Sequence, residues 1–173
     1  TEVGTKIMKL AADDIKRVSL ELGGKSPNIV FADADWQRAA LESPMSVFAN
    51  TGQDCCARSR MFIEQSIFDD FVSQFVSATE ELNIGDPLLD DTQIGPMVSS
   101  DQRELSESFI AEAKGDGRNV LTGGERLSGS GFYLKPAVVT GTEINDRVWR
   151  EEIFGPVVCL RPFSDEAAMI SEV

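Results

Sequence analysis

The sequence predicts an α/β fold in which helices cross over between the strands of one sheet. Short apolar segments such as "NIVFAD" and "PVVCLRPF" have the length and composition of buried strands. Segments with apolar residues at every third or fourth position separate them and predict helices. With 173 residues, of which 42% are hydrophobic and 26% charged, the chain is long enough for one well-buried domain.

The first fifty residues alternate between helix and strand patterns. Residues 1–10 have the pattern of a helix that the chain enters partway. In "RVSLELGG", residues 17–24, apolar and polar side chains alternate, which predicts a strand that ends at two glycines. A helix is expected over residues 35–48, with Asp35 as its N-cap and a kink or restart at Pro44.

The rest of the chain continues this alternation. Residues 60–65 predict a strand, and the clearest helix follows at residues 66–82, where Ser66 and Asp69 resemble a capping box. Further elements are expected after the loop "GDPLLDDTQIGPM": a helix over 99–114, the strands "NVLTGG", "YLKPAVVTG" and "PVVCLRPF", and a helix from 164. Both ends have the pattern of cuts through secondary structure, so we expect a longer protein.

Charge and cysteine content exclude several classes of function. A net charge of −13 argues against nucleic acid and anionic membranes as partners, because both attract basic surfaces. No apolar run approaches the roughly 20 residues of a membrane span, and the N-terminal segment lacks the apolar core of a secretory signal. Three cysteines do not suggest a disulfide framework. We therefore expect a protein of the reducing cytoplasm.

The absence of histidine narrows the chemistry further. The chain alone cannot perform His-assisted serine or cysteine catalysis, and it lacks a common zinc ligand, so no metal site is expected. A general base would have to be Glu, Asp, Lys or Tyr.

The segment "NTGQDCCARSR", residues 50–60, holds the candidates for a nucleophile. A cysteine is reactive when it is accessible and when nearby positive charge favours its thiolate. Two arginines follow the pair Cys55 and Cys56, whereas Asp54 opposes the thiolate. Alternatively, both cysteines are buried small hydrophobes, as most free cysteines are. The residues alone do not show which of the two cysteines would be the nucleophile. Cys159, inside an apolar run, is expected to serve packing.

Two other segments carry carboxylates suited to a site. Glu21 lies on the polar face of its predicted strand, before Gly23 and Gly24, where a ligand could approach the backbone closely. Partial burial would raise the pKa of Glu21 towards neutrality, as a general base requires. The alternative is an exposed strand glutamate. "EEIFGP", residues 151–156, places two carboxylates beside an aromatic ring, a combination suited to sugar hydroxyls and a flat ring.

Together these segments resemble the aldehyde dehydrogenase superfamily in order and spacing. "LELGGKSP" is similar to that family's glutamate motif, "NTGQDCCARSR" to its cysteine motif, and "EEIFGPV" to its segment near the nicotinamide. The connecting stretches "GDPLLDDTQIGPMVS", "GGERL" and "GFYLKPAVV" are also similar, so the resemblance covers essentially the whole chain. It implies the catalytic-domain fold of this family, an open, mostly parallel sheet with crossover helices on both faces.

The resemblance implies the catalytic roles. The family's Gly-Gln-x-Cys pattern selects Cys55 as the nucleophile, and Glu21 matches its general base. In the family mechanism the thiolate attacks an aldehyde carbon, a hydride passes to NAD(P)+, and water activated by the glutamate hydrolyses the thioester. The oxyanion is held by the nucleophile's own N–H and by an asparagine whose segment would precede Thr1.

The resemblance also implies a cofactor, NAD or NADP. The cofactor-binding residues it implies are Glu152, Phe154, Thr1, Val3, Leu22 and Gly23. Glu152 matches the residue that holds the nicotinamide ribose, and Phe154 the aromatic ring packed beside the nicotinamide. Thr1 would begin the helix whose N-terminal end meets the pyrophosphate, a position suited to anions. Val3 would line the adenine side.

The domain organisation follows from the same resemblance. Residues 1–20 would end a dinucleotide-binding domain, and residues 21–173 would form a catalytic domain truncated at its C-terminal end. Much of the cofactor site would then lie outside this chain, so the isolated chain is expected to be inactive or nearly so. The intact protein is expected to be a homodimer or homotetramer that acts on a small aldehyde.

Asp54 and Cys56 flank the implied nucleophile and are expected to touch the substrate channel. An acidic Asp54 would favour cationic substrates such as amino- or trimethylammonio-aldehydes. One alternative is a relative that passes the thioester to CoA or phosphate, although Glu21 argues against it because such acceptors have less need of a base. Another alternative is a non-catalytic homologue with a structural or binding role.

Overall fold

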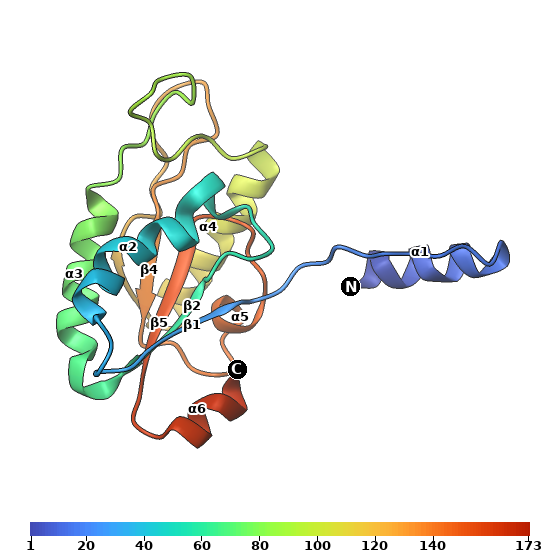
Figure 1. Cartoon of the computed structure of the whole chain (residues 1–173). Helices are drawn as coiled ribbons and strands as arrows, with labels where there is room; N and C mark the ends of the chain where they lie inside the picture. Colours follow the sequence, from blue (N-terminus) through green and yellow to red (C-terminus); the bar gives the residue numbers. More distant parts are fainter.

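Five strands form one mostly parallel sheet in the computed structural model, which describes residues 1–173 (Figure 1). The strands are β1 (Pro27–Val30), β2 (Arg60–Glu64), β3 (Asn119–Thr122), β4 (Ala137–Thr140) and β5 (Val157–Phe163), in the spatial order β1-β2-β5-β4-β3. Strands β1, β2, β5 and β4 run parallel, and β3 pairs antiparallel with β4 at one edge. The predicted fold class is confirmed.

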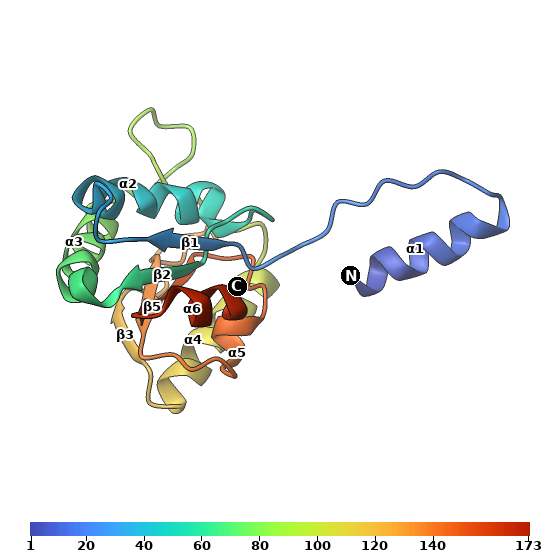
Figure 2. The same ribbon diagram turned by 60° about the horizontal axis from the view of Figure 1, so that its bottom comes forward.

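Helices cover both faces of this sheet (Figure 2). The helices of the chain are α1 (Glu2–Asp13), which lies apart from the sheet, and α2 (Trp36–Phe48), α3 (Phe68–Glu80), α4 (Ser100–Gly115), α5 (Arg147–Arg150) and α6 (Glu166–Glu172), with short 3-10 helices at Ala49–Gly52 and Gln65–Ile67. Residues of α2 and α3 pack on one face, and residues of α4, α5 and α6 on the other. None of these helices is long and apolar enough to cross a membrane.

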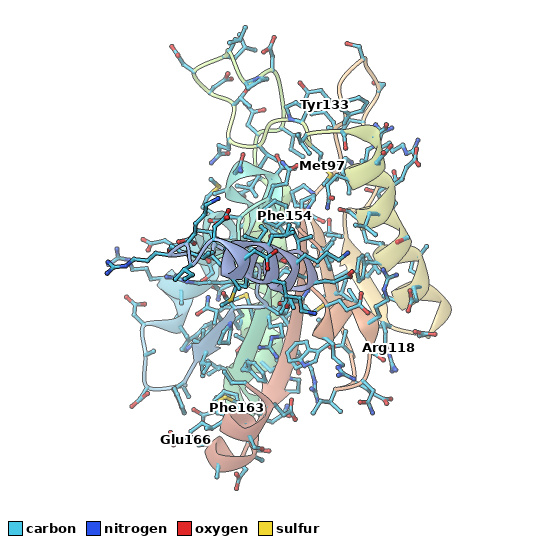
Figure 3. All side chains as sticks on the ribbon, turned by 90° about the vertical axis from the view of Figure 1, so that its right-hand side faces the viewer. Met97, Arg118, Tyr133, Phe154, Phe163 and Glu166 are labelled. Carbon is cyan, nitrogen blue, oxygen red and sulfur yellow. The ribbon has the colours of Figure 1, made fainter.

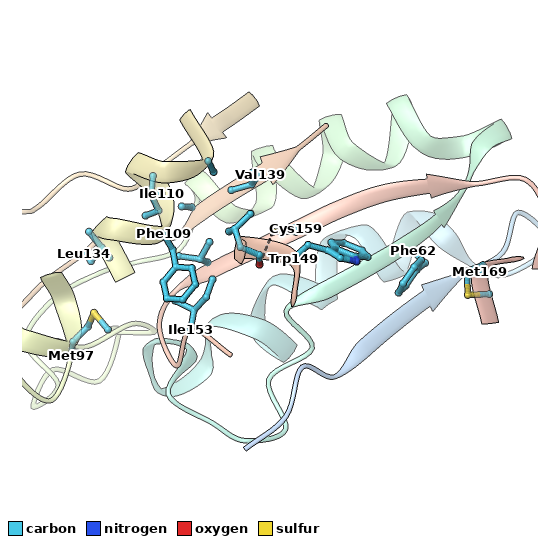
Figure 4. Close-up of a cluster of buried hydrophobic side chains, with 14 residues drawn as sticks. Phe62, Met97, Phe109, Ile110, Leu134, Val139, Trp149, Ile153, Cys159 and Met169 are labelled. Carbon is cyan, nitrogen blue, oxygen red and sulfur yellow. Dashed lines mark hydrogen bonds between the residues drawn. The ribbon is translucent and has the colours of Figure 1, made fainter. Parts of the chain in front are cut away.

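Alternate strand residues divide the core into two clusters, one on each face. In β5, Val158 packs with the α2 and α3 side, whereas Cys159 packs with the opposite cluster, drawn in Figure 4. There Phe62 meets Trp149 edge to face, with ring centroids 5.1 Å apart. The buried Cys159 thiol donates to the Val148 carbonyl at 3.6 Å. The predicted packing role of Cys159 is confirmed.

The N-terminal segment lies apart from the sheet. Helix α1 stands away from the rest of the chain, to which residues 16–26 connect it (Figures 1 and 2). The strand predicted over residues 17–24 is wrong, because a strand needs hydrogen bonds to a neighbour and no segment pairs with this one. Gly4 is buried on α1 against the side chains of Leu20 and Leu22.

The start of α2 agrees with the prediction, whereas its course at Pro44 and the start of α3 differ from it. Asp35 caps α2 as expected, and its carboxylate accepts a backbone N–H of the first turn at 3.3 Å. The helix then continues through the buried Pro44 without a restart. The capping box expected for α3 is wrong: α3 has Ile67 as its N-cap residue, and the Ser66 hydroxyl donates instead to the Glu64 carboxylate at 3.3 Å.

Candidate active site

A tight loop after α2, here called the cysteine loop (residues 50–57), presents the two adjacent cysteines to solvent. Asn50, Thr51 and Gly52 all have positive φ angles, of 52°, 59° and 68°, which is uncommon for residues with side chains. The chain therefore turns sharply away from α2. Cys55 and Cys56 are both exposed, so the interpretation that they are buried hydrophobes is wrong.

Gln53 fixes the start of the cysteine loop. Its Nε2 atom donates to the Asn50 carbonyl at 3.1 Å, and its Oε1 atom accepts the Val98 N–H at 2.9 Å. The Thr51 hydroxyl adds a bond to the Gly95 carbonyl at 3.0 Å. These bonds tie the loop to the segment that precedes α4, a role that sequence reasoning missed because the partners are distant in the chain.

The cysteine loop packs directly against the segment of residues 151–157. A Cβ atom on Gly52 would overlap the carbonyl oxygen of Gly155, so this approach requires glycine. Phe154 is exposed on this segment with a φ angle of 56° (Figure 3, viewed from the side on which α1 lies). Gln102 of α4 supports the strained backbone, since its Nε2 donates to the carbonyls of Ile153 and Phe154 at 2.8 and 3.0 Å. No sequence pattern singles out Gln102.

The glutamate segment joins the same place through its glycines. The Gly24 N–H donates to Oε1 of Glu152 at 3.3 Å. A Cβ atom on Gly23 would overlap the Glu152 carboxylate, and one on Gly24 would lie 3.9 Å from the Cys55 carbonyl oxygen. Three segments that are distant in sequence therefore meet at one end of the sheet.

A polar cavity of about 240 Å³ opens between α1 and this meeting point. Its lining residues are Thr1, Gly23, Gly24, Lys25, Arg150 and Glu152. Thr1 precedes the first turn of α1, where backbone N–H groups attract anions. The Lys25 ammonium is buried without a hydrogen-bond partner, and this burial lowers the pKa of Lys25 to about 8. With Arg150, these groups suit a polar, anionic ligand.

A larger cavity lies elsewhere. It has a volume of about 430 Å³ between the end of α3 and the loop after β3, and none of the predicted site residues line it. Asp54 and Phe154 instead share a narrow crevice with Gly52 and Glu152, between the cysteine loop and the 151–157 segment.

Within this chain, the surroundings of Cys55 oppose its thiolate. Its Sγ atom lies 3.8 Å from that of Cys56, and this thiol neighbour, then the loss of solvation, then the negative charge of Asp54, raise the pKa of Cys55. The Asp54 carboxylate accepts the Cys56 N–H at 2.9 Å. Neither Arg58 nor Arg60 is among the groups that shift the pKa of Cys55, and the Nε atom of Arg60 donates to the Lys25 carbonyl at 2.9 Å. Every group that shifts this pKa raises it, so nothing in this chain favours the thiolate of Cys55.

Glu21 lies on the connecting segment, two residues before Gly23, with an exposed side chain, and it lines none of the three spaces described above. Glu21 is therefore exposed, as in the alternative interpretation, although its segment is not a strand. Leu22 packs partly on Gly4 and remains 41% exposed, and Val3 on α1 is 65% exposed. The structure thus brings Thr1, Gly23 and Glu152 together in one cavity, but leaves Val3 and Leu22 outside its lining.

Comparison with known proteins gives consistent matches over the whole chain. The sequence profile of the aldehyde dehydrogenase family matches residues 1–173. Aminoaldehyde dehydrogenase 2, peroxisomal, of Pisum sativum is 42% identical over 169 residues, which are 96% of this chain and 34% of that protein. An aldehyde dehydrogenase of Emericella nidulans is 42% identical over 171 residues, 98% of this chain and 34% of that protein.

Solved structures match equally well. The NAD+ complex of an aldehyde dehydrogenase from Bacillus cereus has a TM-score of 0.93 and 37% identity, and the match covers 98% of this chain and 35% of that one. Betaine aldehyde dehydrogenase from Staphylococcus aureus in complex with NAD+ has a TM-score of 0.92 and 35% identity, with 99% and 35% covered. The chain spans about a third of the length of these relatives.

Proposed function

Because the chain belongs to the aldehyde dehydrogenase family, we propose that the intact protein oxidises an aldehyde to a carboxylic acid with NAD+, with Cys55 as the nucleophile. The observation that carries this proposal is the meeting of three distant segments. Gly52 of the cysteine loop contacts Gly155, and Gly24 of the glutamate segment binds Glu152. A nucleophile, a base and a cofactor must meet in this way before any of them can act on one substrate.

The polar cavity fits part of a dinucleotide. Thr1 would offer the N-terminal end of α1 to the pyrophosphate, and Glu152 would accept hydrogen bonds from the nicotinamide ribose. Gly23 leaves room for the Glu152 carboxylate. Phe154 would pack beside the nicotinamide, and NAD+, when bound, accepts the hydride. Val3 would lie on the adenine side of the cofactor, and Leu22, directly before Gly23, would also contact the cofactor.

The chemical steps belong to the residues of the cysteine loop and to Glu21. Cys55 would attack the aldehyde carbon and form a tetrahedral thiohemiacetal, whose oxyanion its own backbone N–H can stabilise. Loss of the hydride leaves a thioester on Cys55. Glu21 would then take a proton from water so that the resulting hydroxide attacks the thioester and releases the acid. A relative that transfers the acyl group to CoA or phosphate has less need of this base.

The negative charge of Asp54 supports the proposal that the substrate is cationic, an amino- or trimethylammonio-aldehyde. Its carboxylate is exposed next to Cys55 and shares a crevice with Phe154. A negative charge there attracts a positively charged aldehyde and repels an anionic one. Two of the matched proteins are named as aminoaldehyde and betaine aldehyde dehydrogenases. Cys56, exposed beside Asp54, would line the same channel.

The domain division and the assembly are part of the same proposal. Residues 1–20 would end a cofactor-binding domain, and residues 21–173 would belong to the catalytic domain. Helix α1 and the residues after it expose the apolar side chains of Val3, Ile7, Met8, Leu10 and Ile15. These side chains need a cover, which the rest of the intact protein and a partner subunit of a homodimer or homotetramer would supply. Three free cysteines favour a reducing compartment such as the cytoplasm.

The test is aldehyde-dependent NADH formation by the intact protein, with wild type compared with Cys55→Ala, in the absence of CoA and phosphate. We expect the wild type to release NADH and free acid together, and the variant to lose activity by about 10³-fold or more. Full activity of the variant would refute Cys55 as the nucleophile. A strict requirement for CoA or phosphate would favour the acyl-transferring alternative.

A further inference from the structure

Asp54, Cys55 and Cys56 also form a candidate site for a metal ion. One ligand atom from each side chain, a carboxylate oxygen and two sulfurs, lies within 4.8 Å of the others. All three residues are exposed, so an ion from solvent can reach them. It is the one group of three such ligands in the chain. Thiolates select thiophilic cations such as Zn²⁺ over Mg²⁺ or Ca²⁺.

The separation of the two sulfurs suits a bridging metal ion better than a disulfide. Two Zn–S bonds of about 2.3 Å at a tetrahedral angle place their sulfurs about 3.8 Å apart. The Sγ atoms of Cys55 and Cys56 are 3.8 Å apart. A disulfide would need the sulfurs to close to about 2.05 Å, in a geometry that adjacent residues reach only with strain. An ion can therefore link the two side chains with little movement.

Asp54 completes the set of protein ligands. Its Oδ1 atom accepts the Cys56 N–H at 2.9 Å, which holds the carboxylate over the loop. The second oxygen, Oδ2, remains available as a ligand, at the distance of about 2.0–2.2 Å that Zn²⁺ takes to a carboxylate. Water would fill the fourth tetrahedral position.

We propose that Zn²⁺, or another thiophilic divalent cation, binds Cys55, Cys56 and Asp54 and reversibly blocks the nucleophile. Two S–H bonds break and two sulfur–metal bonds form as two protons pass to solvent, with no change of oxidation state. The ion is an inhibitor and takes no part in the reaction. The inhibitory effect rests on the proposed function of Cys55, whereas binding of the ion does not.

Binding is tested with Co²⁺ as a spectroscopic probe on the reduced, metal-free intact protein. We expect a near-ultraviolet thiolate-to-cobalt absorption band in the wild type, reduced by about half in Cys56→Ser because one of two thiolate ligands is lost. Cys159→Ala is the matched control, and its band should equal that of the wild type because Cys159 is buried. A wild type without the band, or a Cys56→Ser band of wild-type intensity, would overturn the site.

Inhibition is tested by Zn²⁺ titration of NADH formation, with each variant normalised to its own metal-free rate. We expect half-inhibition of Cys56→Ser at a Zn²⁺ concentration about tenfold or more above that of the wild type, and recovery of both with a chelator. Equal sensitivity of wild type and Cys56→Ser would refute the inhibitory role. If the protein oxidises no aldehyde, the proposed function fails, while the Co²⁺ band still decides whether the ion binds.

Discussion

Gly52 lies so close to Gly155 that a Cβ atom on Gly52 would overlap the Gly155 carbonyl oxygen. This approach joins the cysteine loop to the segment that carries Glu152 and Phe154. Gly52 also has a φ angle of 68°, a conformation in which a side chain is strained. One residue without a side chain therefore meets two separate requirements of the site.

Substitution of Gly52 should cost more than substitution of a glycine with the same backbone conformation in open space. Gly117 has a φ angle of 77°, and no atom lies within 4 Å of the place that a methyl group would occupy, so Gly117→Ala should lose only about 1–2 kcal/mol of unfolding free energy. Gly52→Ala adds the steric overlap and should lose about 2–5 kcal/mol. Urea unfolding of both variants of the intact protein measures the difference. Equal losses would show that the contact with Gly155 contributes nothing.

The charge of Asp54 should matter only for cationic substrates. Asp54→Asn removes the charge but keeps an oxygen that can accept the Cys56 N–H. We expect KM for an amino- or trimethylammonio-aldehyde to rise about fivefold, equivalent to about 1 kcal/mol for one exposed charge pair. Steady-state kinetics with a neutral aldehyde of similar length provide the control. An equal rise for both aldehydes would contradict the proposed specificity.

Glu21→Gln should separate the two halves of the reaction. If Glu21 activates the hydrolytic water, the variant still forms the thioester but hydrolyses it about 10²- to 10⁴-fold more slowly. Rapid mixing with aldehyde and NAD+ should then give one equivalent of NADH per site in a burst, followed by a slow phase. Loss of the burst together with turnover would instead place Glu21 in the first half-reaction.

Lys25 should make stability depend on pH in a defined direction. Burial lowers the pKa of Lys25 from 10.5 to about 8, near Cys159, Arg60, Glu152 and Glu151. Between these values the unfolded state binds more protons than the folded state, so the free energy of unfolding rises with pH across this range. Lys25→Met removes the cost of burying the charge and should stabilise the protein by up to about 3 kcal/mol at pH 7.

This gain should shrink as pH rises from about 8 to above 10.5, the range over which the wild-type lysine becomes neutral in both states. Urea unfolding of Lys25→Met and wild type at pH 7 and at the upper end of the range measures the difference at each pH. A difference that is constant with pH would mean that the pKa of Lys25 is the same in the folded and unfolded states, which would contradict its lowering by burial.

The elements of the core could be predicted from the sequence because their burial follows local periodicity. In β5, consecutive residues such as Val158 and Cys159 face opposite clusters, and both are apolar, as expected for a strand that is buried on both faces. The same local rule fails for residues 17–24, where the alternation is present but no neighbouring strand pairs with the segment. Strand formation depends on a partner, which a local pattern does not contain.

The candidate site likewise contains residues that the sequence identifies and residues that it does not. Family resemblance selects Cys55, Glu21 and Glu152, but not the groups that hold them. Gln53 binds Val98, and Gln102 binds carbonyls 51 and 52 positions away. Such long-range bonds arise from the packing of α4 on the sheet, and a single sequence carries no signal for them.

The role of Cys55 is tested most sharply by locating the acyl group on the protein. Glu21→Gln is mixed with a cationic aldehyde and NAD+, quenched in acid during the NADH burst, and digested for tandem mass spectrometry, with Cys56→Ser in the same background as control. We expect one acyl group on Cys55 in both proteins, in amounts equal to the NADH formed. An acyl group on Cys56, or a burst of NADH with Cys55 unmodified, would contradict the assignment of Cys55 as the nucleophile.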